Sequence, residues 1–414
     1  MPGPPTTCRS ARVQPWLAAV DAEIAILGGG CAGLSLATHL TADRGPRRAR
    51  VVVLEARRDY TRDRTWCFWP VEPHPFTDAV SHRWARWEVL DQGRRVRRGS
   101  PHLPYVQIPA DAFYARARER IDAAPAVDLH LGVDVRRVDD RGDHVALDTS
   151  GGPLRVAHVF DTRPPLAPAA ASAVAEVTLL QHFVGWEVVA DRPAFDPEVV
   201  TLMDFSVPQR DGLHFVYVLP YAADRALVEA TYFTPALLPE ATYERALRDY
   251  LGDRLGVGAF EVVLRERGVI PMTTAPPALR QSPRVHNLGL RGGAAKASTG
   301  YAFLAIQRSA AELARRLAIA RPGALIDPPE PRPALAVAMD RVFLSHLERH
   351  PERAPALFVD LFERLPPDLL IRFLSDRATP AECLRVMAST PLAAMTREVL
   401  RSRARWLRPA SRPL

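Results

Sequence analysis

The sequence predicts an α/β protein with three structural parts. Residues 24–27 form a fully apolar strand followed at once by a glycine-rich turn, a pattern typical of a nucleotide-binding βαβ unit. Alternating segments separated by Asp-Gly and proline turns lie between residues 181 and 233 and indicate an antiparallel sheet. From residue 328 onward the pattern is helical with proline breaks. A chain of 414 residues is long enough for two or three such parts and a sizeable core.

The glycine-rich turn reads GGGCAG at residues 28–33 and has glycines at GxGxxG spacing. We expect Gly28 to permit the tight turn out of the strand, and Gly30 to let a pyrophosphate approach the backbone because it has no Cβ. Gly33 would let the next helix, at about residues 31–41, pack close to the strand. The free N–H groups at the start of that helix would then face the phosphates.

A second apolar strand at residues 50–54 is followed by Glu55, which lies 22 residues after Gly33. In dinucleotide-binding domains an acid at this place accepts hydrogen bonds from a ribose diol. Strand, glycine turn, helix, strand and acid therefore occur in the order of a Rossmann-type domain. These residues alone are compatible with FAD or NAD(P), and an ordinary βαβ unit with a glycine-rich turn is the alternative.

The remainder of the first part is predicted to contain loops and short strands. An arginine- and aromatic-rich segment at residues 57–70 is expected to be a loop over a cofactor or ligand. Residues 105–109 form a strand, and Asp111 is a candidate N-cap for the helix that follows. Short alternating segments between residues 127 and 148 fit a β-meander.

The antiparallel sheet follows an alanine- and proline-rich linker at residues 166–175. Its predicted strands are residues 181–189, 200–207, 213–219 and 226–233. A helix is expected at about residues 241–255, after which the chain returns to the first part. A turn at residues 292–300 then leads into a helix that begins near Tyr301.

These patterns divide the chain into four regions. Residues 1–20, rich in proline and arginine, are expected to be a disordered extension. The nucleotide-binding domain takes residues 21–165 and 266–325, with the antiparallel-sheet domain inserted at 166–265 and the helical region at 326–405. Two interpretations of the helical region remain: it packs on the rest of the protein, or part of it contacts a membrane.

Composition excludes several classes of function. The formal net charge is +7, but the arginines are scattered along the chain near acids, which argues against nucleic-acid binding and leaves weak attraction to anionic lipid open. Lys296 is the only lysine in the sequence. It has two possible interpretations, a specific charge role or an exposed position in a turn. The cysteines lack the spacing of a metal site or a disulfide framework, so we expect no metal and a reducing cytoplasm. They are Cys8, Cys31, Cys67 and Cys383. No apolar run reaches the ~18 residues of a membrane span.

Seven motifs occur in a distinctive order along the chain. They are DRTWCFW (residues 63–69), VFDTRPP (159–165), LMDF (202–205), FVYVLP (215–220), ALVEATYF (226–233), GVIPM (268–272) and RGGAAKASTGYAF (291–303). In this order they resemble the bacterial lycopene β-cyclase family, and FERLPPDLLIRFL at residues 362–374 is similar too. The resemblance extends from about residue 21 to residue 392 and is more specific than the glycine motif alone.

This resemblance implies an FAD-binding fold related to flavoprotein hydroxylases. It implies proton-initiated cyclisation of the ψ end groups of lycopene to β rings, through γ-carotene to β-carotene, with no net redox change. In that family reduced flavin is required and NADPH is the usual source of electrons. The resemblance also implies a cytoplasmic enzyme that associates peripherally with the inner face of the cell membrane.

The family's catalytic glutamate matches Glu229, and the acid that often follows it is Ala230 here, so a second carboxylate is not identified. Strand geometry supports the assignment independently, because Leu227, Glu229 and Thr231 share one face of a strand. A carboxyl that faces an apolar ligand loses hydration, so its pKa rises and it can act as a general acid at neutral pH. A solvent-facing glutamate at a sheet edge is the alternative.

Further residues are assigned to cofactor and substrate. For the flavin or its phosphates, we expect backbone N–H groups from four residues of the 292–300 turn. These are Gly292, Gly293, Thr299 and Gly300. Arg64 is assigned to the cofactor, while Trp66, Phe68 and Trp69 are assigned to the substrate, where ring faces would stabilise a cation. Packing over the adenosine of FAD is the alternative for this segment. Asp204, a polar group in an apolar strand, is also assigned to the substrate.

Two other functions remain compatible with the sequence. One is an FAD-dependent monooxygenase or isoprenoid reductase that acts on a lipophilic substrate. Those families carry a GDAAH-like or GDAAG-like motif after the last core strand, whereas this chain has GLRGG at residues 289–293 and lacks the Asp. The other is a membrane-associated protein that only binds a carotenoid.

Overall fold

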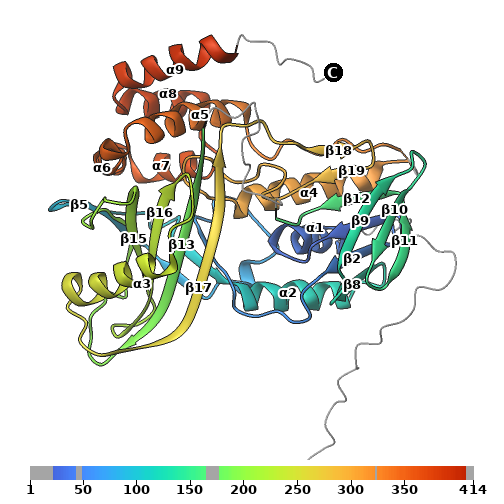
Figure 1. Ribbon diagram of the computed structural model, residues 1–414, viewed down its shortest axis with the longest axis horizontal. Coiled ribbons are helices and arrows are strands. Elements are labelled where there is room, and N and C mark those ends of the chain that lie inside the picture. Colours follow the sequence, from blue (N-terminus) through green and yellow to red (C-terminus); the bar gives the residue numbers. More distant parts are fainter. Residues whose placement is uncertain (1–21, 43–48, 165–176, 322–323, 407–414) are drawn as a thin grey trace, which may run out of the picture.

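The computed structural model describes residues 22–42, 49–164, 177–321 and 324–406. Figure 1 shows two regions of β-structure side by side, with the C-terminal helices gathered at one end of the larger sheet. The extension predicted at residues 1–20 and the linker predicted at 166–175 lie outside the described residues.

A mostly parallel sheet forms the nucleotide-binding part, in the strand order β18-β19-β12-β1-β2-β8. The strands are β18 (Arg280–Ser282), β19 (Val285–Asn287), β12 (His158–Asp161), β1 (Ile24–Leu27), β2 (Val51–Glu55) and β8 (Val127–Leu131). β1 pairs in parallel with both β2 and β12. Both β1 and β2 are buried along their whole length, as the apolar runs at residues 24–27 and 51–54 predict.

Helices α1 (Cys31–Thr41), α2 (Ala110–Asp122) and α4 (Phe303–Ile319) pack around this sheet, with α1 in contact with both of the others. The range of α1 is as predicted. Helix α2 buries Phe113, Ala117 and Ile121, which share one face. It begins two residues earlier than expected, because Pro109 rather than Asp111 occupies the N-cap.

Two local predictions differ from the structure. Only β9 (Val135–Asp140), β10 (Val145–Thr149) and β11 (Gly152–Val156) form the meander, since β8 joins the parallel sheet beside β2. The segment expected to be a loop contains β3 (Thr65–Phe68), which pairs with β7 (Tyr105–Pro109), and β7 also pairs with β4 (His82–Trp84). The two faces of β3 pack against different apolar clusters, so the strand lacks the apolar–polar alternation of a half-exposed strand.

A larger sheet has the order β17-β13-β16-β15-β14-β5-β6. Its strands are β17 (Phe260–Thr273), β13 (Thr178–Ala190), β16 (Arg225–Thr234), β15 (Leu213–Pro220), β14 (Val199–Asp204), β5 (Arg86–Asp91) and β6 (Arg94–Gly99). The four predicted strands are present. The sheet is not confined to residues 166–265, however, because β5 and β6 come from the first part and β17 extends past residue 265. It is also mixed, since β5 pairs in parallel with β14 and covers an edge that β14 would otherwise expose.

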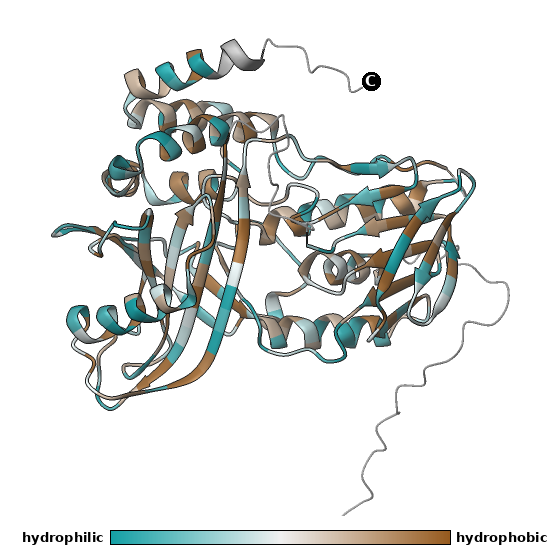
Figure 2. Cartoon of the chain, in the orientation of Figure 1, coloured by the Kyte–Doolittle hydropathy of each residue, from teal (hydrophilic) through white to brown (hydrophobic). Residues whose placement is uncertain are grey.

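The two faces of the larger sheet are covered by different elements. On one face, Trp186, Val228 and Tyr232 form an apolar cluster with Tyr243 and Leu247 of α3 (Glu240–Asp249). Most of α3 is coloured as hydrophilic in Figure 2, as expected for a helix with one buried face. On the other face, Phe215, Leu227 and Phe233 form a cluster with Trp69, Tyr105 and apolar side chains of the C-terminal helices.

The C-terminal helices are α5 (Ala334–Arg349), α6 (Ala354–Arg364), α7 (Pro367–Leu374), α8 (Pro380–Ser389) and α9 (Leu392–Trp406). Most of the predicted apolar stripe, including Leu344, Phe358 and Leu370, is buried against the larger sheet. Packing on the protein therefore accounts for these side chains. Within the described residues, every helix is too short or too polar to cross a lipid bilayer.

Candidate active site

The glycine turn has the geometry expected of a phosphate-binding loop. Gly28 has φ +94°, a value that residues with a Cβ rarely adopt. A Cβ on Gly33 would lie 1.9 Å from the carbonyl oxygen of Gly28, so only glycine permits this helix–strand contact. A Cβ on Gly30 would meet nothing within 4 Å, which leaves the backbone accessible to a ligand. The first N–H groups of α1 have no acceptor within the helix and are free to bind an anion.

Glu55 lies at the end of β2 beside this turn, as predicted. Its Oε2 accepts a hydrogen bond from the backbone N–H of Gly29 at 2.6 Å, and Arg57 donates to both carboxylate oxygens. Burial acts to raise the pKa of Glu55, but the hydrogen bonds from Arg57 and Gly29 lower it below its usual value. The carboxylate is therefore charged and orders the turn, and a ribose would have to compete with Arg57 for it.

The turn at residues 292–300 differs from the prediction. The N–H groups of Gly292 and Gly293 donate to the carbonyls of Gly289 and Leu290, and those of Thr299 and Gly300 both donate to the carbonyl of Lys296. These four N–H groups thus have acceptors within the turn, and their assignment to the flavin stays a prediction that these hydrogen bonds do not support. The hydroxyl of Thr299, by contrast, is buried and has no hydrogen-bond partner among the described residues. It is the polar atom of this turn that a bound group would satisfy.

Lys296 is not an exposed turn residue. Its ammonium donates to Asp340 at 2.9 Å and to Asp376 at 3.1 Å, and its side chain is 1% exposed. Arg332 donates to the same two carboxylates. The single lysine therefore joins the 292–300 turn to the C-terminal helices through a buried network of charges.

The aromatic residues of the β3 segment divide between two environments. Trp66 packs on Phe113 and Tyr114 inside the nucleotide-binding part, while Phe68 stacks on Phe303 at a centroid distance of 4.4 Å. Trp69 lies against Trp87, Tyr105 and Tyr301 instead. Phe68 and Trp69 line one pocket together with Tyr301, Leu374 and Asp376.

Arg64 is exposed and occupies a position beside the larger sheet. Its guanidinium donates to the backbone carbonyls of Asp63 and Arg267. These bonds connect the start of β3 to β17. The structure therefore places Arg64 between the two parts of the molecule, and its assignment to the cofactor stays a prediction.

Glu229 lies in the middle of β16, a central strand of the larger sheet, and not at a sheet edge. Its neighbours across the strand pairs are Gly185 on β13 and Tyr217 on β15. Thr231, on the same face as predicted, donates to its Oε1 at 2.7 Å. Burial, followed by the charge of Glu266, raises the pKa of Glu229 to about 8. A carboxyl with this pKa is mostly protonated at neutral pH.

Two residues that sequence reasoning missed lie beside Glu229. Glu266 on β17 is 5% exposed, and Cys67 on β3 is close enough that the charges of both glutamates, after burial, raise the pKa of its thiol. Cys67 is visible within the DRTWCFW motif, but nothing in the sequence indicates which way it points. Glu266 lies just before the GVIPM motif, and its proximity to Glu229 depends on strand pairing that local patterns do not reveal.

Asp204 does not lie with Glu229. Tyr250 and Arg254 donate to its carboxylate from the turn after α3, on the opposite face of the sheet. The reason is a bulge between Thr201 and Asp204, which reverses the face that strict alternation predicts. Asp204 therefore lies on the face opposite Glu229, and its assignment to the substrate stays a prediction that this position does not support.

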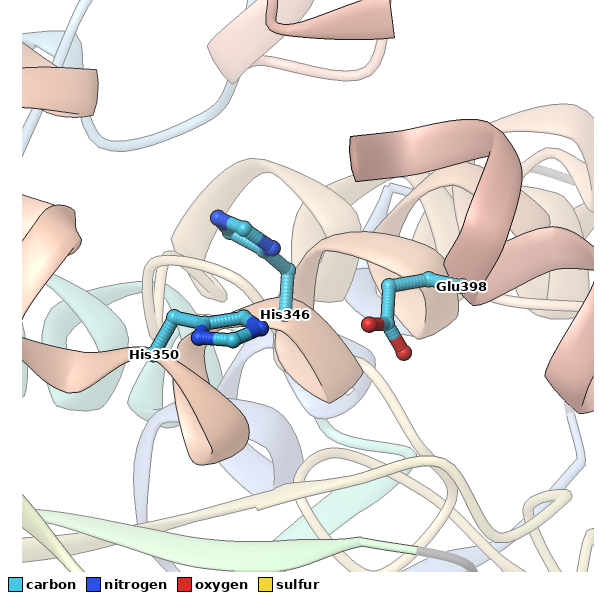
Figure 3. Close-up of side chains that lie close together, drawn as sticks. All are labelled: His346, His350 and Glu398. Carbon is cyan, nitrogen blue, oxygen red and sulfur yellow. The ribbon is translucent and has the colours of Figure 1, made fainter. Parts of the chain in front are cut away.

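A separate cluster of metal-type ligands lies among the C-terminal helices. The nearest ligand atoms of His346, His350 and Glu398 are within 4.8 Å of one another, and Figure 3 shows the three side chains converging from α5, its C-terminal end and α9. Arg349 and Arg401 already donate to the two oxygens of Glu398. Two guanidinium groups compensate the charge of the carboxylate and would repel a cation. We therefore interpret the cluster as a polar contact that connects α5 to α9.

Comparisons with known proteins extend these observations. The family model described as "Lycopene cyclase protein" matches residues 23–400. A lycopene beta-cyclase from Paracoccus sp. (strain N81106 / MBIC 01143) is 28% identical over 393 residues, which are 89% of this chain and 94% of the relative.

Solved structures share the fold. A geranylgeranyl bacteriochlorophyll reductase-like protein from Thermoplasma acidophilum has a TM-score of 0.59 at 11% identity and covers 91% of this chain and 98% of its own. The flavin-dependent monooxygenase PieE, solved in complex with FAD and substrate, has a TM-score of 0.59 at 15% identity, over 91% of this chain and 72% of that one. The predicted fold class, a flavoprotein-type α/β domain with a second sheet and a helical C-terminal region, is confirmed.

Proposed function

The chain belongs to the lycopene cyclase family, and from this premise we propose that it is a lycopene β-cyclase that converts the ψ end groups of lycopene to β rings, through γ-carotene to β-carotene. The observation that carries this proposal is the environment of Glu229. A carboxyl group sits in a central strand, beside an apolar cluster, with a pKa raised to about 8 by burial and by Glu266. This is the state that a proton donor to an unactivated double bond requires.

The proposed chemistry follows from the lack of polar groups in lycopene. Glu229 would donate its proton to a terminal double bond, and the resulting cation would close the ring. Loss of a proton from the ring then places the double bond and gives the β end group, so the enzyme gains and loses no electrons. Trp69 and Tyr301 lie at the pocket beside this face and would exclude water and stabilise the cation through their rings.

FAD is the cofactor that the residues fit best. The accessible backbone at Gly30, the N-terminus of α1 and the buried, unpartnered hydroxyl of Thr299 together suit a dinucleotide that extends from the glycine turn towards the larger sheet. When bound in its reduced form, the flavin supplies negative charge that stabilises a nearby cation, by roughly 4 kcal/mol at about 4 Å and an effective dielectric near 20. We propose NADPH as the source of the electrons that keep it reduced.

We further propose peripheral association with the inner face of the cell membrane, where the apolar substrate would reside. Four exposed leucines on the C-terminal helices support this: Leu335, Leu384, Leu392 and Leu400. Leu384→Glu combined with Leu392→Glu should reduce co-sedimentation with anionic vesicles. Leu237→Glu, at an exposed leucine before α3, is the matched control. Equal sedimentation of the two variants would contradict this attachment surface.

The direct test of the function is expression in a lycopene-accumulating bacterium followed by pigment analysis. A cyclase converts lycopene to γ-carotene and β-carotene. An FAD-dependent monooxygenase or isoprenoid reductase would instead consume NADPH in proportion to product and give an oxidised or reduced pigment. A protein that only binds carotenoid would leave lycopene unchanged. An oxidised or reduced pigment would refute the proposal, and so would unchanged lycopene.

A further inference from the structure

Glu229 and Glu266 are paired with the same residue of the strand between them. Gly185 on β13 pairs with Glu229 on one side and with Glu266 on the other. Residues aligned in this way point to the same face of a sheet. Because neighbouring strands are about 4.8 Å apart, the two Cα atoms are separated by roughly 10 Å, and side chains of this length reach towards one another.

The residue between the two glutamates is a glycine, and this removes the barrier between them. A Cβ at position 185 would lie 3.1 Å from Cγ and 3.6 Å from Oε1 of Glu266. It would also lie 3.2 Å from Cδ1 of Leu227. The side chain of Glu266 therefore extends over Gly185, towards β16 and Glu229. Gly185 has no positive φ, so close packing rather than backbone conformation explains its identity.

Burial raises the pKa of Glu266 above its usual value, and its polar neighbours oppose this shift by favouring the charged form. Thr65 donates to its Oε2 at 2.7 Å, and the guanidinium groups of Arg62 and Arg64 act on it with positive charge. Arg64 is held beside it by a hydrogen bond to the carbonyl of the next residue, Arg267. Asp63 acts in the opposite direction, but that carboxylate is already paired with Arg57.

Among the residues that the structure describes, no cation acts on Glu229. The titratable groups near it are Glu266, the thiol of Cys67 and the phenol of Tyr217. Tyr221 also lies near Glu266. Burial raises the pKa values of Cys67, Tyr217 and Tyr221 well above neutral, so these three groups stay uncharged. Thr231 is the one hydroxyl in this set that donates to Glu229.

We propose that Glu266 is the positioning residue of this site: it remains ionised beside Thr65, Arg62 and Arg64, and its negative charge across Gly185 holds the transferable proton on Glu229. The pair then carries one proton, because two like charges in one buried site do not ionise together. This proposal rests on the proposed function, and it names the second carboxyl of the reaction.

The position next to Glu229 could not supply that carboxyl. Ala230 is fully buried in the cluster against α3, on the other face of the sheet. An acid at 230 would therefore point away from Glu229. In this chain the second acid comes from β17, two strands away, and not from the neighbouring residue in the sequence.

The test is an infrared titration of the FAD-loaded protein. The carboxylic C=O band that is missing in Glu229→Gln reports the protonation of Glu229, and Glu266→Gln should lower its midpoint by about one pH unit or more. Glu266→Asp keeps the charge, so its midpoint should lie close to that of the wild-type protein. Glu261→Gln, at an exposed glutamate of the same strand, should leave the midpoint unchanged. An unchanged midpoint in Glu266→Gln would overturn the proposal.

Activity gives a second readout. The alkaline limb of the pH–rate profile should move to lower pH in Glu266→Gln and return in Glu266→Asp, whereas a purely structural role would lower activity at every pH without moving the limb. If the wild-type protein fails to cyclise lycopene, the proposed function fails, and the infrared titration still decides the role of Glu266.

Discussion

The glycine turn contains a buried glutamate, Glu55, the centre of the larger sheet contains a half-buried one, Glu229, and the two have opposite properties. Hydrogen bonds from Gly29 and Arg57 hold the pKa of Glu55 below its usual value. At Glu229, burial and a neighbouring carboxyl raise the pKa to about 8. The donors around a carboxyl, more than its burial, thus decide whether it orders a loop as an anion or stores a proton.

Replacement of Glu229 is the change that separates the two glutamates most strongly. Glu229→Gln keeps the shape and the contact with Thr231 but removes the proton that is transferred. We expect β-ring formation to fall by about 10²–10⁴-fold, the usual contribution of a general acid. Pigment analysis measures the loss, and the flavin absorbance of the purified variant checks that the cofactor stays bound. Near-normal turnover would remove Glu229 from the mechanism.

The pH dependence of turnover distinguishes a proton donor from an ionised base. Because the acid form is active, the rate of the chemical step should be constant below the pKa and fall about tenfold per pH unit above about 8. The measurement is single-turnover cyclisation in vesicles between pH 6 and pH 10, values chosen to bracket about 8. A rate that increases with pH would show that the ionised form of Glu229 is active.

Replacement of Glu55 should affect stability and not the proton transfer. Glu55→Gln removes the charge that Arg57 and Gly29 bind, and we expect the free energy of unfolding to fall by about 1–3 kcal/mol. The pKa of Glu55 is lower in the folded protein, so this stabilisation is complete above the unfolded pKa and is lost as pH falls through the folded one.

Urea unfolding at neutral and acidic pH measures the effect of Glu55→Gln. The difference in the free energy of unfolding between the variant and the wild-type protein should be smaller at the acidic pH. Glu23→Gln, at an exposed glutamate before β1, is the control. A shift in the alkaline limb of activity in Glu55→Gln would mean that the two glutamates are not independent.

Replacement of Gly185 is expected to have the smallest effect on the rate of cyclisation. Gly185→Ala forces the side chains of Glu266 and Leu227 to move by a few tenths of an ångström, at a cost of about 0.5–1.5 kcal/mol, or roughly two- to tenfold in rate. Gly258→Ala is the matched control, because a Cβ there makes only an ordinary contact with Asp191. Steady-state rates of both variants provide the comparison, and equal rates would show that the spacing at Gly185 does not matter.

The parts of the molecule that depend on local sequence were predictable. The βαβ unit around Gly28 and Glu55 spans neighbouring residues, and its apolar runs and glycines directly reflect burial and backbone conformation. The face of Glu229 followed from alternation alone, since β16 is a regular strand.

The parts that depend on pairing between distant segments were not predictable. Glu266 meets Glu229 only because β17 and β16 both pair with β13, and no local pattern encodes that order. The position of Asp204 on the face opposite Glu229 depends on a bulge in β14, which the sequence pattern does not reveal. The N–H groups of the 292–300 turn appeared free in the sequence, but the fold uses them internally.

The most direct test of proton-initiated cyclisation is turnover of lycopene in heavy water by the FAD-loaded enzyme, followed by mass spectrometry of the carotenoid product. If Glu229 delivers a solvent-exchangeable proton and a different proton leaves the ring, each β ring formed should contain one deuterium, without stoichiometric oxidation of NADPH. Product without deuterium, or NADPH consumed in proportion to product, would contradict this mechanism.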